Sequence, residues 1–526
     1  MFLKKEKLIA EILILTFIII YSYLINWHSG NIGIIPIDSF GFLDTGYSII
    51  NGHLPIRDFW IFTGLLVDYM EAVFLYLFGN NWNSHLAHSS FMNIVATAGL
   101  YFFLKEYNLK LSYIFFYCLC FATLCYPLSG TPFAYMHAYI FSLLAIFNLL
   151  IAIKKRNNFL WFLFPFVCLF AFLSMQTPTV YILTILIILL ISYFLGEKKF
   201  ENLKFFLIGG ISSISLFFLF LVLTETPIIN FIYQYILFPL TIGEGRITSK
   251  EIAYISLIDQ FNLKRLFGEF KFIHIFLIPL TFLSLKNIRK NDRSINILNF
   301  IVILSVLAFL FNQLITANQI YIFSLIPILA ATIHINLNSI KVNNKIFYLI
   351  IFVVLFATVK FHLRFNIDRK FLDLENVDKS KAINVNKINK NFNNLKWISK
   401  YANPKNELIV IEQALGVINR DDRKKTLITH YQFIATILDK PLYILNRWYL
   451  WDNNTHPTEN HKYFKFYKSL VNKNIKKNNI EVIYLLGQKN MIKFDNVKNY
   501  FTDVCFESKT LIQDKFSSHK IIKCKK

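Results

Sequence analysis

Long apolar runs separated by short polar loops fill the first 361 residues of this chain. In windows of about 19 residues, the length of helix that crosses a bilayer, eleven segments are predominantly apolar. These segments are residues 8–26, 86–104, 111–127, 134–153, 159–175, 178–196, 204–223, 271–286, 294–315, 319–337 and 345–361. The pattern therefore predicts a polytopic α-helical membrane protein with about eleven transmembrane helices.

Basic residues gather in every second loop. Lys154 and Arg156 follow one apolar segment and Lys286 and Arg289 follow another, whereas most alternate loops lack basic clusters. Because positive residues stay on the cytoplasmic side, this bias places residues 362–526 outside the cytoplasm after an odd number of spans. We expect a multi-pass protein of a bacterial cytoplasmic (inner) membrane. The loop bias and anionic lipids account for much of the net charge of +23, so no nucleic-acid partner is predicted.

The first sizeable polar stretch, residues 36–68, lies where hydropathy places the membrane edge. It carries four carboxylates, which are Asp38, Asp44, Asp58 and Asp68. Charge is costly there unless pairing or function keeps it. Residues 39–51 are spaced as a short helix, with Asp38 or Ser39 as its N-cap and Gly52 as its left-handed stop. We expect this helix to lie along the bilayer surface, with Asp38 at its entrance.

A second amphipathic helix is predicted from about residue 60 to residue 78. It is apolar enough to span a bilayer, but Asp68 and Glu71 lie in its middle, and counting it as a span would reverse the charge bias of every later loop. We therefore expect an interfacial helix in the headgroup region, with its acidic pair on the wet side.

The chain changes character after the membrane domain, residues 1–361. A linker rich in Asn and Lys, residues 362–400, leads to residues 401–526, which we expect to form a small extracytoplasmic α/β domain. The predicted elements of this domain are buried strands at 407–413, 441–445 and 481–487 and helices at 427–438 and 461–473.

Two features of the tail leave alternatives open. Cys505 and Cys524 are either joined in a disulfide, if the tail is extracytoplasmic, or free. Residues 447–451 (RWYLW) either stack on a sugar ring or belong to the core of the domain. The other four cysteines lie in apolar segments, where they are expected to be small core hydrophobes.

Short motifs follow the first apolar helix in a fixed order: Asp38-Ser39, residues 52–59 (GHLPIRDF), residues 63–66 (TGLL) and residues 77–79 (LFG). With the topology, they resemble the GT-C class of membrane glycosyltransferases, which contains the protein O-mannosyltransferases and the lipid A aminoarabinose transferases. Members carry an acidic motif soon after the first transmembrane helix and then a pattern like G-x-x-P-Y-R-D-F. The resemblance covers residues 8–200 by pattern and the rest by topology.

Ser39 departs from it, standing where a second acidic residue is usual, and His137 lies near the place of a later expected Asp.

The resemblance implies a GT-C-like fold and an inverting transfer of a sugar from a polyprenyl phosphate or diphosphate to an extracytoplasmic acceptor hydroxyl, in an envelope glycan, lipid or protein. Such a step needs a carboxylate to take the acceptor's proton and positive charge to stabilise the departing phosphate. Asp38 is the first candidate for the base and Asp44 the second. The alternatives are that Asp38 only caps its helix and that Asp44 only faces solvent.

Candidate substrate-binding residues lie in two loops. In residues 224–270, Glu244, Arg246 and Lys250 accompany glycines that let a backbone approach an anion, although the two cations also suit lipid headgroups. In the first loop, Arg57 either binds substrate or pairs with Asp58.

His137 completes the candidate substrate-binding residues. His85 and His88 have metal-ligand spacing but no defined carboxylate partner, so hydrogen-bonded histidines at the interface are the better interpretation. No metal ligands are predicted, and the need for a divalent cation stays open.

Three rival functions remain at this stage. A transporter or flippase for a lipid-linked glycan predicts internal repeats and charges in mid-helix, which the sequence lacks. A glycan polymerase or ligase predicts a larger central loop than residues 224–270. A noncatalytic envelope-assembly subunit would account for Ser39 and His137.

Overall fold

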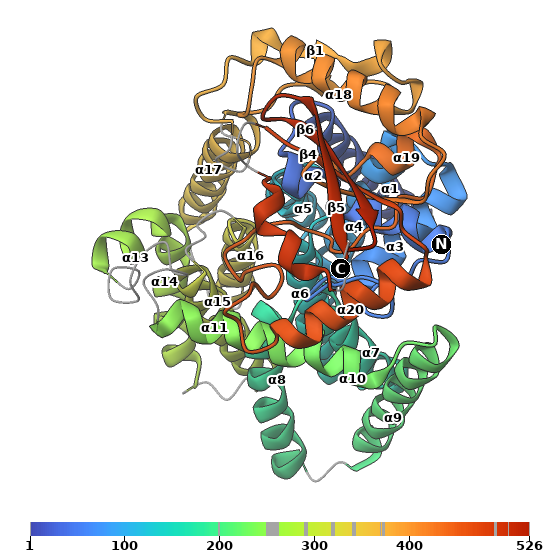
Figure 1. Ribbon diagram of the computed structural model, residues 1–526. Helices are drawn as coiled ribbons and strands as arrows, with labels where there is room; N and C mark the ends of the chain where they lie inside the picture. The colour runs from blue at the N-terminus through green and yellow to red at the C-terminus, as the bar shows by residue number, and fades with distance from the viewer. Residues whose placement is uncertain are drawn as a thin grey trace.

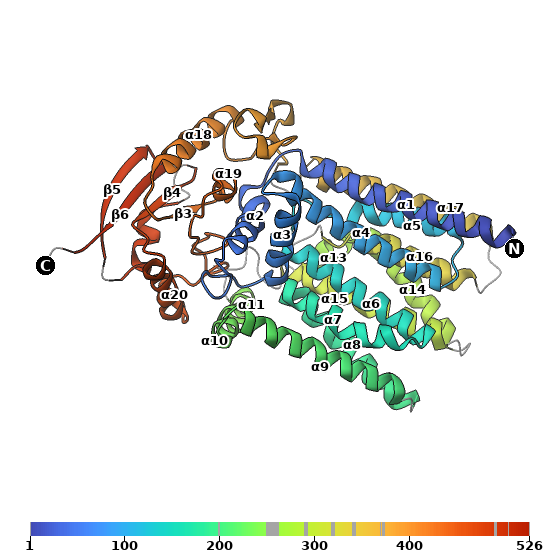
Figure 2. The ribbon, with the colours of Figure 1, turned by 90° about the vertical axis from the view of Figure 1, so that its right-hand side faces the viewer.

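The computed structural model describes residues 2–197, 200–248, 262–288, 293–316, 321–338, 343–368, 370, 374–488, 492–502 and 504–524. Its helices form a bundle, and a smaller part that contains a β-sheet sits against one end of that bundle (Figures 1 and 2). Helices α2 and α3 lie between the two (Figure 2). The chain is thus built in three layers along the bundle axis.

Each of the eleven predicted segments contains a helix. These helices are α1 (Phe2–Gly30), α4 (Trp82–Glu106), α5 (Leu111–Cys125), α6 (Ala134–Lys155), α7 (Asn158–Ser174), α8 (Gln176–Glu197), α9 (Phe200–Leu223), α14 (Lys271–Ile288), α15 (Arg293–Ile315), α16 (Leu325–Asn338) and α17 (Asn344–Phe361). Leu13, Ile211 and Phe352, on three different helices, each expose more than half of their surface, as lipid-facing residues do.

Six helices among the described residues are long and apolar enough to cross a membrane. They are Glu6–Gly30, Ala134–Lys155, Gln176–Gly196, Glu201–Leu223, Arg293–Ile315 and Asn344–Asp368. A seventh span results if α13 (Leu263–Glu269) and the start of α14, which meet at 88°, are counted as one. Several predicted spans, such as α5, α7 and α16, are shorter than the bilayer requires of an untilted helix. The protein is therefore a multi-pass membrane protein by composition, and the number eleven stays a prediction.

Helix α2 (Pro36–Ile50) begins three residues earlier than predicted. Proline suits the first turn of a helix because its fixed φ is helical and its missing N–H would have no partner there. Asp38 is therefore inside the first turn and is not the N-cap. Ser39 Oγ accepts a hydrogen bond from the Ile35 N–H, at 3.0 Å. The predicted end is confirmed, because Gly52 adopts a φ of +77° just beyond the helix.

Helix α3 (Leu65–Phe78) begins later than predicted, because Gly64 precedes it in the left-handed conformation with a φ of +72°. Asp68 and Glu71 are both completely buried. The prediction that this acidic pair faces water is therefore wrong. Helix α3 packs against α2, α4 and α7, so its polar side is enclosed by protein rather than by solvent.

Between α9 and α13, residues 228–248 are helical. They contain α10 (Ile228–Phe231), a π-helical turn η1 (Ile232–Leu237) and α11 (Phe238–Thr248). Gly243 and Gly245 lie inside α11, so they do not form the anion-binding loop that the sequence suggested.

The C-terminal part contains a four-stranded mixed sheet of order β3-β4-β6-β5. Its elements are α18 (Pro404–Arg420), β3 (Lys425–Thr429), α19 (Ile434–Leu438), α20 (Phe464–Lys477), β4 (Val482–Leu486), β5 (Cys505–Ile512) and β6 (Phe516–Ile522). Strands β3 and β4 are parallel, and β6 is antiparallel to both β4 and β5. A separate two-stranded sheet joins β1 (Ile383–Asn384) to β2 (Lys396–Trp397).

Three predictions about this part are corrected. Residues 407–413 lie in α18, residues 441–445 form no strand among the described residues, and the predicted helix at 427–438 begins as β3. The strand at 481–487 and the helix at 461–473 are confirmed within a few residues as β4 and α20. Cys505 and Cys524 form a disulfide that links the start of β5 to the residues after β6.

Candidate functional site

The carboxylate of Asp68 joins three parts of the chain. Thr45 of α2 donates a hydrogen bond from Oγ1 to Asp68 Oδ1 at 2.5 Å, and Arg447 of the C-terminal part forms an ion pair with Asp68 Oδ2. Arg447 also donates to the Thr63 carbonyl oxygen at 2.5 Å and lies over the ring of Phe42. Burial raises the pKa of Asp68 to about 6 even beside this guanidinium. The three-way contact fixes α2 relative to α3.

Asp44 is buried on α2 next to Thr45, with 4% of its surface exposed. Within the described part of the chain, no hydrogen bond to its carboxylate is found and no cation pairs with it. Burial therefore raises its pKa to about 8. The alternative that Asp44 faces solvent is wrong. A carboxyl group with such a pKa is mostly protonated at neutral pH, and it is suited to exchange a proton there.

Asp38 is half-buried in the first turn of α2, where the helix dipole favours a carboxylate. The segment 447–451 covers this part of the helix. The indole Nε1 of Trp448 donates to the carbonyl oxygen of Ile37 at 3.0 Å, and a Cβ on Gly41 would come within 2.6 Å of the same nitrogen. Trp448 thus packs on α2 and not in the core of the C-terminal part, whereas Tyr449 is buried in that core with Tyr467.

Arg57 and Asp58 pair with one another. Arg57 Nη2 lies 2.7 Å from Asp58 Oδ2, and Lys477 of α20 lies 2.7 Å from Asp58 Oδ1. Although burial raises the pKa of Asp58, the hydrogen bonds from Arg57 and Lys477 hold it below its usual value. Arg57 also donates to the carbonyl oxygen of Thr224, just after α9. The pairing interpretation of Arg57 agrees with these contacts.

The second predicted anion site is only partly visible. Glu244 is exposed on α11, and its carboxylate lies 3.9 Å from the ammonium group of Lys462. The backbone of Arg246 is in α11, but its side chain lies outside the described part of the chain, as does the whole of Lys250. The part that Arg246 and Lys250 play in an anion site therefore stays a prediction.

His137 belongs to a chain of buried hydrogen bonds that sequence reasoning missed. Glu71 accepts from His85 and His88, each through Nδ1 at 2.7 Å, and His88 Nε2 lies 3.1 Å from His137 Nε2. Beyond these, His85 Nε2 donates to the Ser39 carbonyl oxygen and His137 Nδ1 donates to the Phe133 carbonyl oxygen. No metal-binding group of three His, Cys, Asp or Glu side chains occurs among the described residues.

Three neutral imidazoles cannot form all five contacts of this chain at once. Its five hydrogen bonds need five protons, whereas His85, His88 and His137 carry one each when neutral. Although burial raises the pKa of Glu71, the two histidines that it binds hold it below its usual value. The chain ties α2, α3, α4 and α6 together.

An apolar groove lies between α3, α7 and α9. Leu65, Leu66 and Tyr69 of α3 line it together with side chains of α7 and α9, and its volume is about 520 Å³. The hydroxyl of Tyr69 is buried and makes no hydrogen bond with the described residues. The groove lies at the end of the bundle that meets α3, because the Gly64 N–H bonds the Ser174 carbonyl oxygen at the end of α7.

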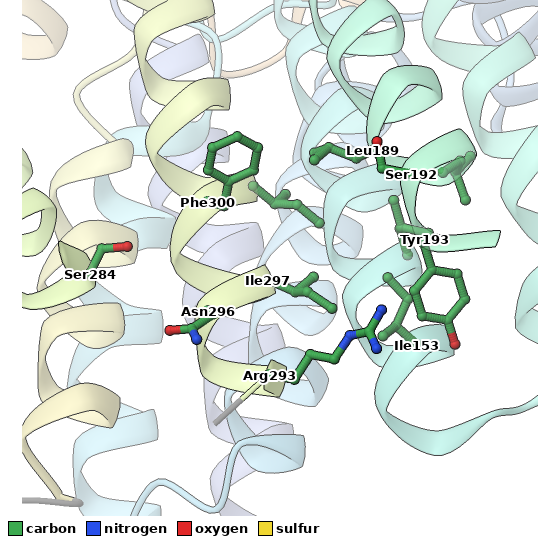
Figure 3. Close-up of a pocket in the computed structure, with 12 residues that line it drawn as sticks. Ile153, Leu189, Ser192, Tyr193, Ser284, Arg293, Asn296, Ile297 and Phe300 are labelled. Atoms are coloured by element: carbon green, nitrogen blue, oxygen red, sulfur yellow. The ribbon is translucent and has the colours of Figure 1, made fainter. Parts of the chain in front are cut away.

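A second cavity, of about 300 Å³, lies between α6, α8 and α15 at their ends away from α3. Its walls are mainly aliphatic and aromatic, and Arg293 points toward Ile153 and Tyr193 (Figure 3). None of the predicted site residues lines this cavity, so the candidate site is placed at the α2 and α3 end.

Comparison with solved structures shows a similarity of fold. No protein-family model matches the chain, and no curated protein matches it. The chain is similar to the crystal structure of the oligosaccharyltransferase of Archaeoglobus fulgidus, in complex with zinc and sulfate, with 12% identity and a TM-score of 0.45. The match covers 90% of this chain and 68% of that one.

Proposed function

We propose that this protein is an integral-membrane glycosyltransferase that moves a sugar from a polyprenyl-phosphate-linked donor to an extracytoplasmic acceptor. The observation that carries the proposal is the placement of Asp38 and Asp44. Both lie on α2, between the helical bundle and the C-terminal part, and α2 is bonded through Asp68 to the helix that lines the apolar groove. A lipid-linked donor needs an apolar channel beside polar catalytic groups.

The reaction that we assign is an inverting displacement. The acceptor oxygen forms a bond to the anomeric carbon, the bond from that carbon to the phosphate oxygen breaks, and the hydroxyl proton passes to a carboxylate. We propose Asp38 as this base because it is the less buried of the two carboxylates on α2. Asp44 is the second candidate.

The groove between α3, α7 and α9 is proposed to hold the polyprenyl chain. Arg57 contacts Thr224, which follows α9 at the outer end of this groove. The donor phosphate would therefore lie near the Arg57 guanidinium, which Asp58 orients. Arg246 and Lys250 remain proposed contacts of the donor phosphate, and Glu244 beside them remains a proposed substrate-binding residue. His137 is completely buried in its hydrogen-bonded chain, and in this proposal it supports α6 beside the site.

The test is Asp38→Asn in the purified full-length protein, assayed with polyprenyl-phosphate sugars and a mixed panel of acceptors by mass spectrometry of the products. We expect at least about 100-fold slower transfer, the usual contribution of a general base. The matched control is Asp378→Asn, an exposed aspartate in the linker. Unchanged transfer by a folded Asp38→Asn protein would reject Asp38 as the base. Movement of the intact donor across the bilayer with no new glycosidic bond would support the transporter instead.

A further inference from the structure

Helix α20 carries a row of lysines on the face that does not enter the core. Tyr467, Leu470 and Val471 are buried on its inner side. The outer side borders an open groove of about 940 Å³, within the size range of ligand pockets. The residues that line it are Lys465, Lys468, Ser469, Asn472, Lys473, Lys476, Lys477 and Thr502. We call this feature the lysine groove.

The charges of the lysine groove are largely uncompensated. Among the described residues that line it, none is acidic, and Lys477, at one end, pairs with Asp58. Like charges spaced three and four residues apart repel one another and destabilise a helix. From Lys465 to Lys476 the positive charge extends about 17 Å along the axis, at 1.5 Å per residue. A single phosphate is too small to contact both ends, whereas a chain of anionic units matches the spacing.

The direction toward the bundle is already occupied by protein. Tyr233 of η1 stacks on Phe466 at 4.3 Å between ring centroids, and Thr241 of α11 hydrogen-bonds His461 at 2.9 Å. Figure 2 shows α10 and α11 between α20 and the bundle. The Phe466 side of α20 is therefore covered, whereas the lysine groove lies on a different face of the helix and stays open to a water-borne anion.

We propose that the lysine groove binds an acidic oligosaccharide, a sugar chain with carboxylate or phosphate groups at regular intervals. Ser469 and Thr502 are both exposed along the groove and add hydroxyl groups that suit sugar hydroxyls. This inference rests on the proposed function, because it names the chemical class of the acceptor. Lys477 connects the groove to Asp58 and Arg57, and hence to the end of α9 beside the apolar groove.

The test measures binding without turnover. The full-length protein, in nanodiscs of phosphatidylcholine, is titrated with the hexamer of galacturonic acid and with maltohexaose, a neutral chain of equal length. We expect saturable binding of the acidic hexamer that weakens steeply with added salt, and no binding of the neutral one. No saturable binding of the acidic hexamer would overturn the proposal.

Two matched sets of substitutions locate the binding. The test set is Lys465→Gln, Lys468→Gln, Lys473→Gln and Lys476→Gln. The control set removes the same charge from exposed lysines elsewhere on the C-terminal part, with Lys405→Gln, Lys509→Gln, Lys520→Gln and Lys523→Gln. We expect the test set to weaken binding by about tenfold or more and the control set to change it less than about twofold. Equal losses in the two sets would show attraction by overall charge and would overturn the assignment.

A final experiment tests whether the anion bound by the lysine groove is a lipid headgroup rather than a soluble oligosaccharide. Nanodiscs that contain phosphatidylglycerol should leave the affinity of the wild-type protein for the acidic hexamer unchanged. Competition by this lipid, lost in the test set, would assign the lysine groove to headgroups instead. The binding assay contains no sugar donor, so a negative binding result does not affect the transfer test of Asp38. Likewise, a negative transfer assay does not affect the binding result.

Discussion

Arg447 forms an ion pair with Asp68 across a sequence separation of 379 residues, and both side chains are almost completely buried. Asp68 also accepts the hydroxyl hydrogen bond of Thr45. The C-terminal part thus contacts α2 and α3 through its segment 447–451, and α2 carries the candidate carboxylates Asp38 and Asp44. The position of α2 depends on residues at both ends of the chain.

Arg447→Met should destabilise the protein by about 3–5 kcal/mol, because it leaves the Asp68 carboxylate buried without its cation. The measurement is thermal unfolding of the purified protein. Arg423→Met is the control, since Arg423 pairs with Asp421 while 38% of its side chain is exposed, and its loss should cost at most about 1 kcal/mol. Adding Asp68→Leu to Arg447→Met should recover most of the loss. Equal effects of the two arginine substitutions would contradict a structural role for the buried pair.

Asp44→Asn should stabilise the protein at neutral pH and have little effect near pH 4. The folded pKa of about 8 exceeds the ordinary value of 3.8, so the folded state holds this proton while the unfolded state releases it. Stability from this group is therefore fully present below the unfolded pKa and declines as pH rises toward the folded pKa. Over about three pH units the difference reaches roughly 4 kcal/mol.

The pH profile of thermal unfolding, recorded for wild type and Asp44→Asn between pH 4 and 8, checks this expectation. The gap between the two curves should widen as pH rises and should be largest near pH 8. A constant gap would show that Asp44 ionises in the folded protein as it does in water.

The bundle could be predicted from sequence because its signal is local. A long apolar run specifies a helix regardless of what surrounds it, and the helices from α4 to α9 and from α14 to α17 were found in this way. The run at residues 407–413 was misassigned because a short apolar stretch does not distinguish a buried strand from a helix face. Asn403, which accepts from the Lys405 N–H, and Pro404 just after it form the helix start signal that identifies α18.

The candidate site was predictable only in part. Its carboxylates stood out because charge near a membrane is rare, and Gly52 marked the end of α2 correctly. The residues that pair with these carboxylates could not be identified from the sequence. Arg447 lies in an aromatic run that also suits a sugar platform, and only the folded chain shows that it pairs with Asp68. Likewise, the spacing of His85 and His88 does not indicate that Glu71 lies between them.

Glu71→Gln should destabilise the protein by about 2–5 kcal/mol. A glutamine amide keeps the shape, but its nitrogen can only donate, so one of the two histidine N–H groups that bond Glu71 loses its buried acceptor. Glu11→Gln is the matched control, because Glu11 pairs with the exposed Lys105 and its loss should cost at most about 1 kcal/mol. Thermal unfolding of both variants gives the comparison. A Glu71→Gln protein as stable as Glu11→Gln would contradict a structural role for the Glu71 carboxylate.

The disulfide between Cys505 and Cys524 gives a prediction about both stability and location. The other four cysteines are free, so a maleimide reagent added to the denatured, unreduced protein should label four thiols, and six after reduction. Closing a loop of this length is worth about 3 kcal/mol, so Cys505→Ser with Cys524→Ser should loosen the hairpin of β5 and β6 and speed its proteolysis. Because disulfides persist in oxidising compartments, protein taken from intact cells should give the count of four if the C-terminal part lies outside the cytoplasm. Six labelled thiols without reduction would place that part in a reducing compartment and reverse the predicted topology.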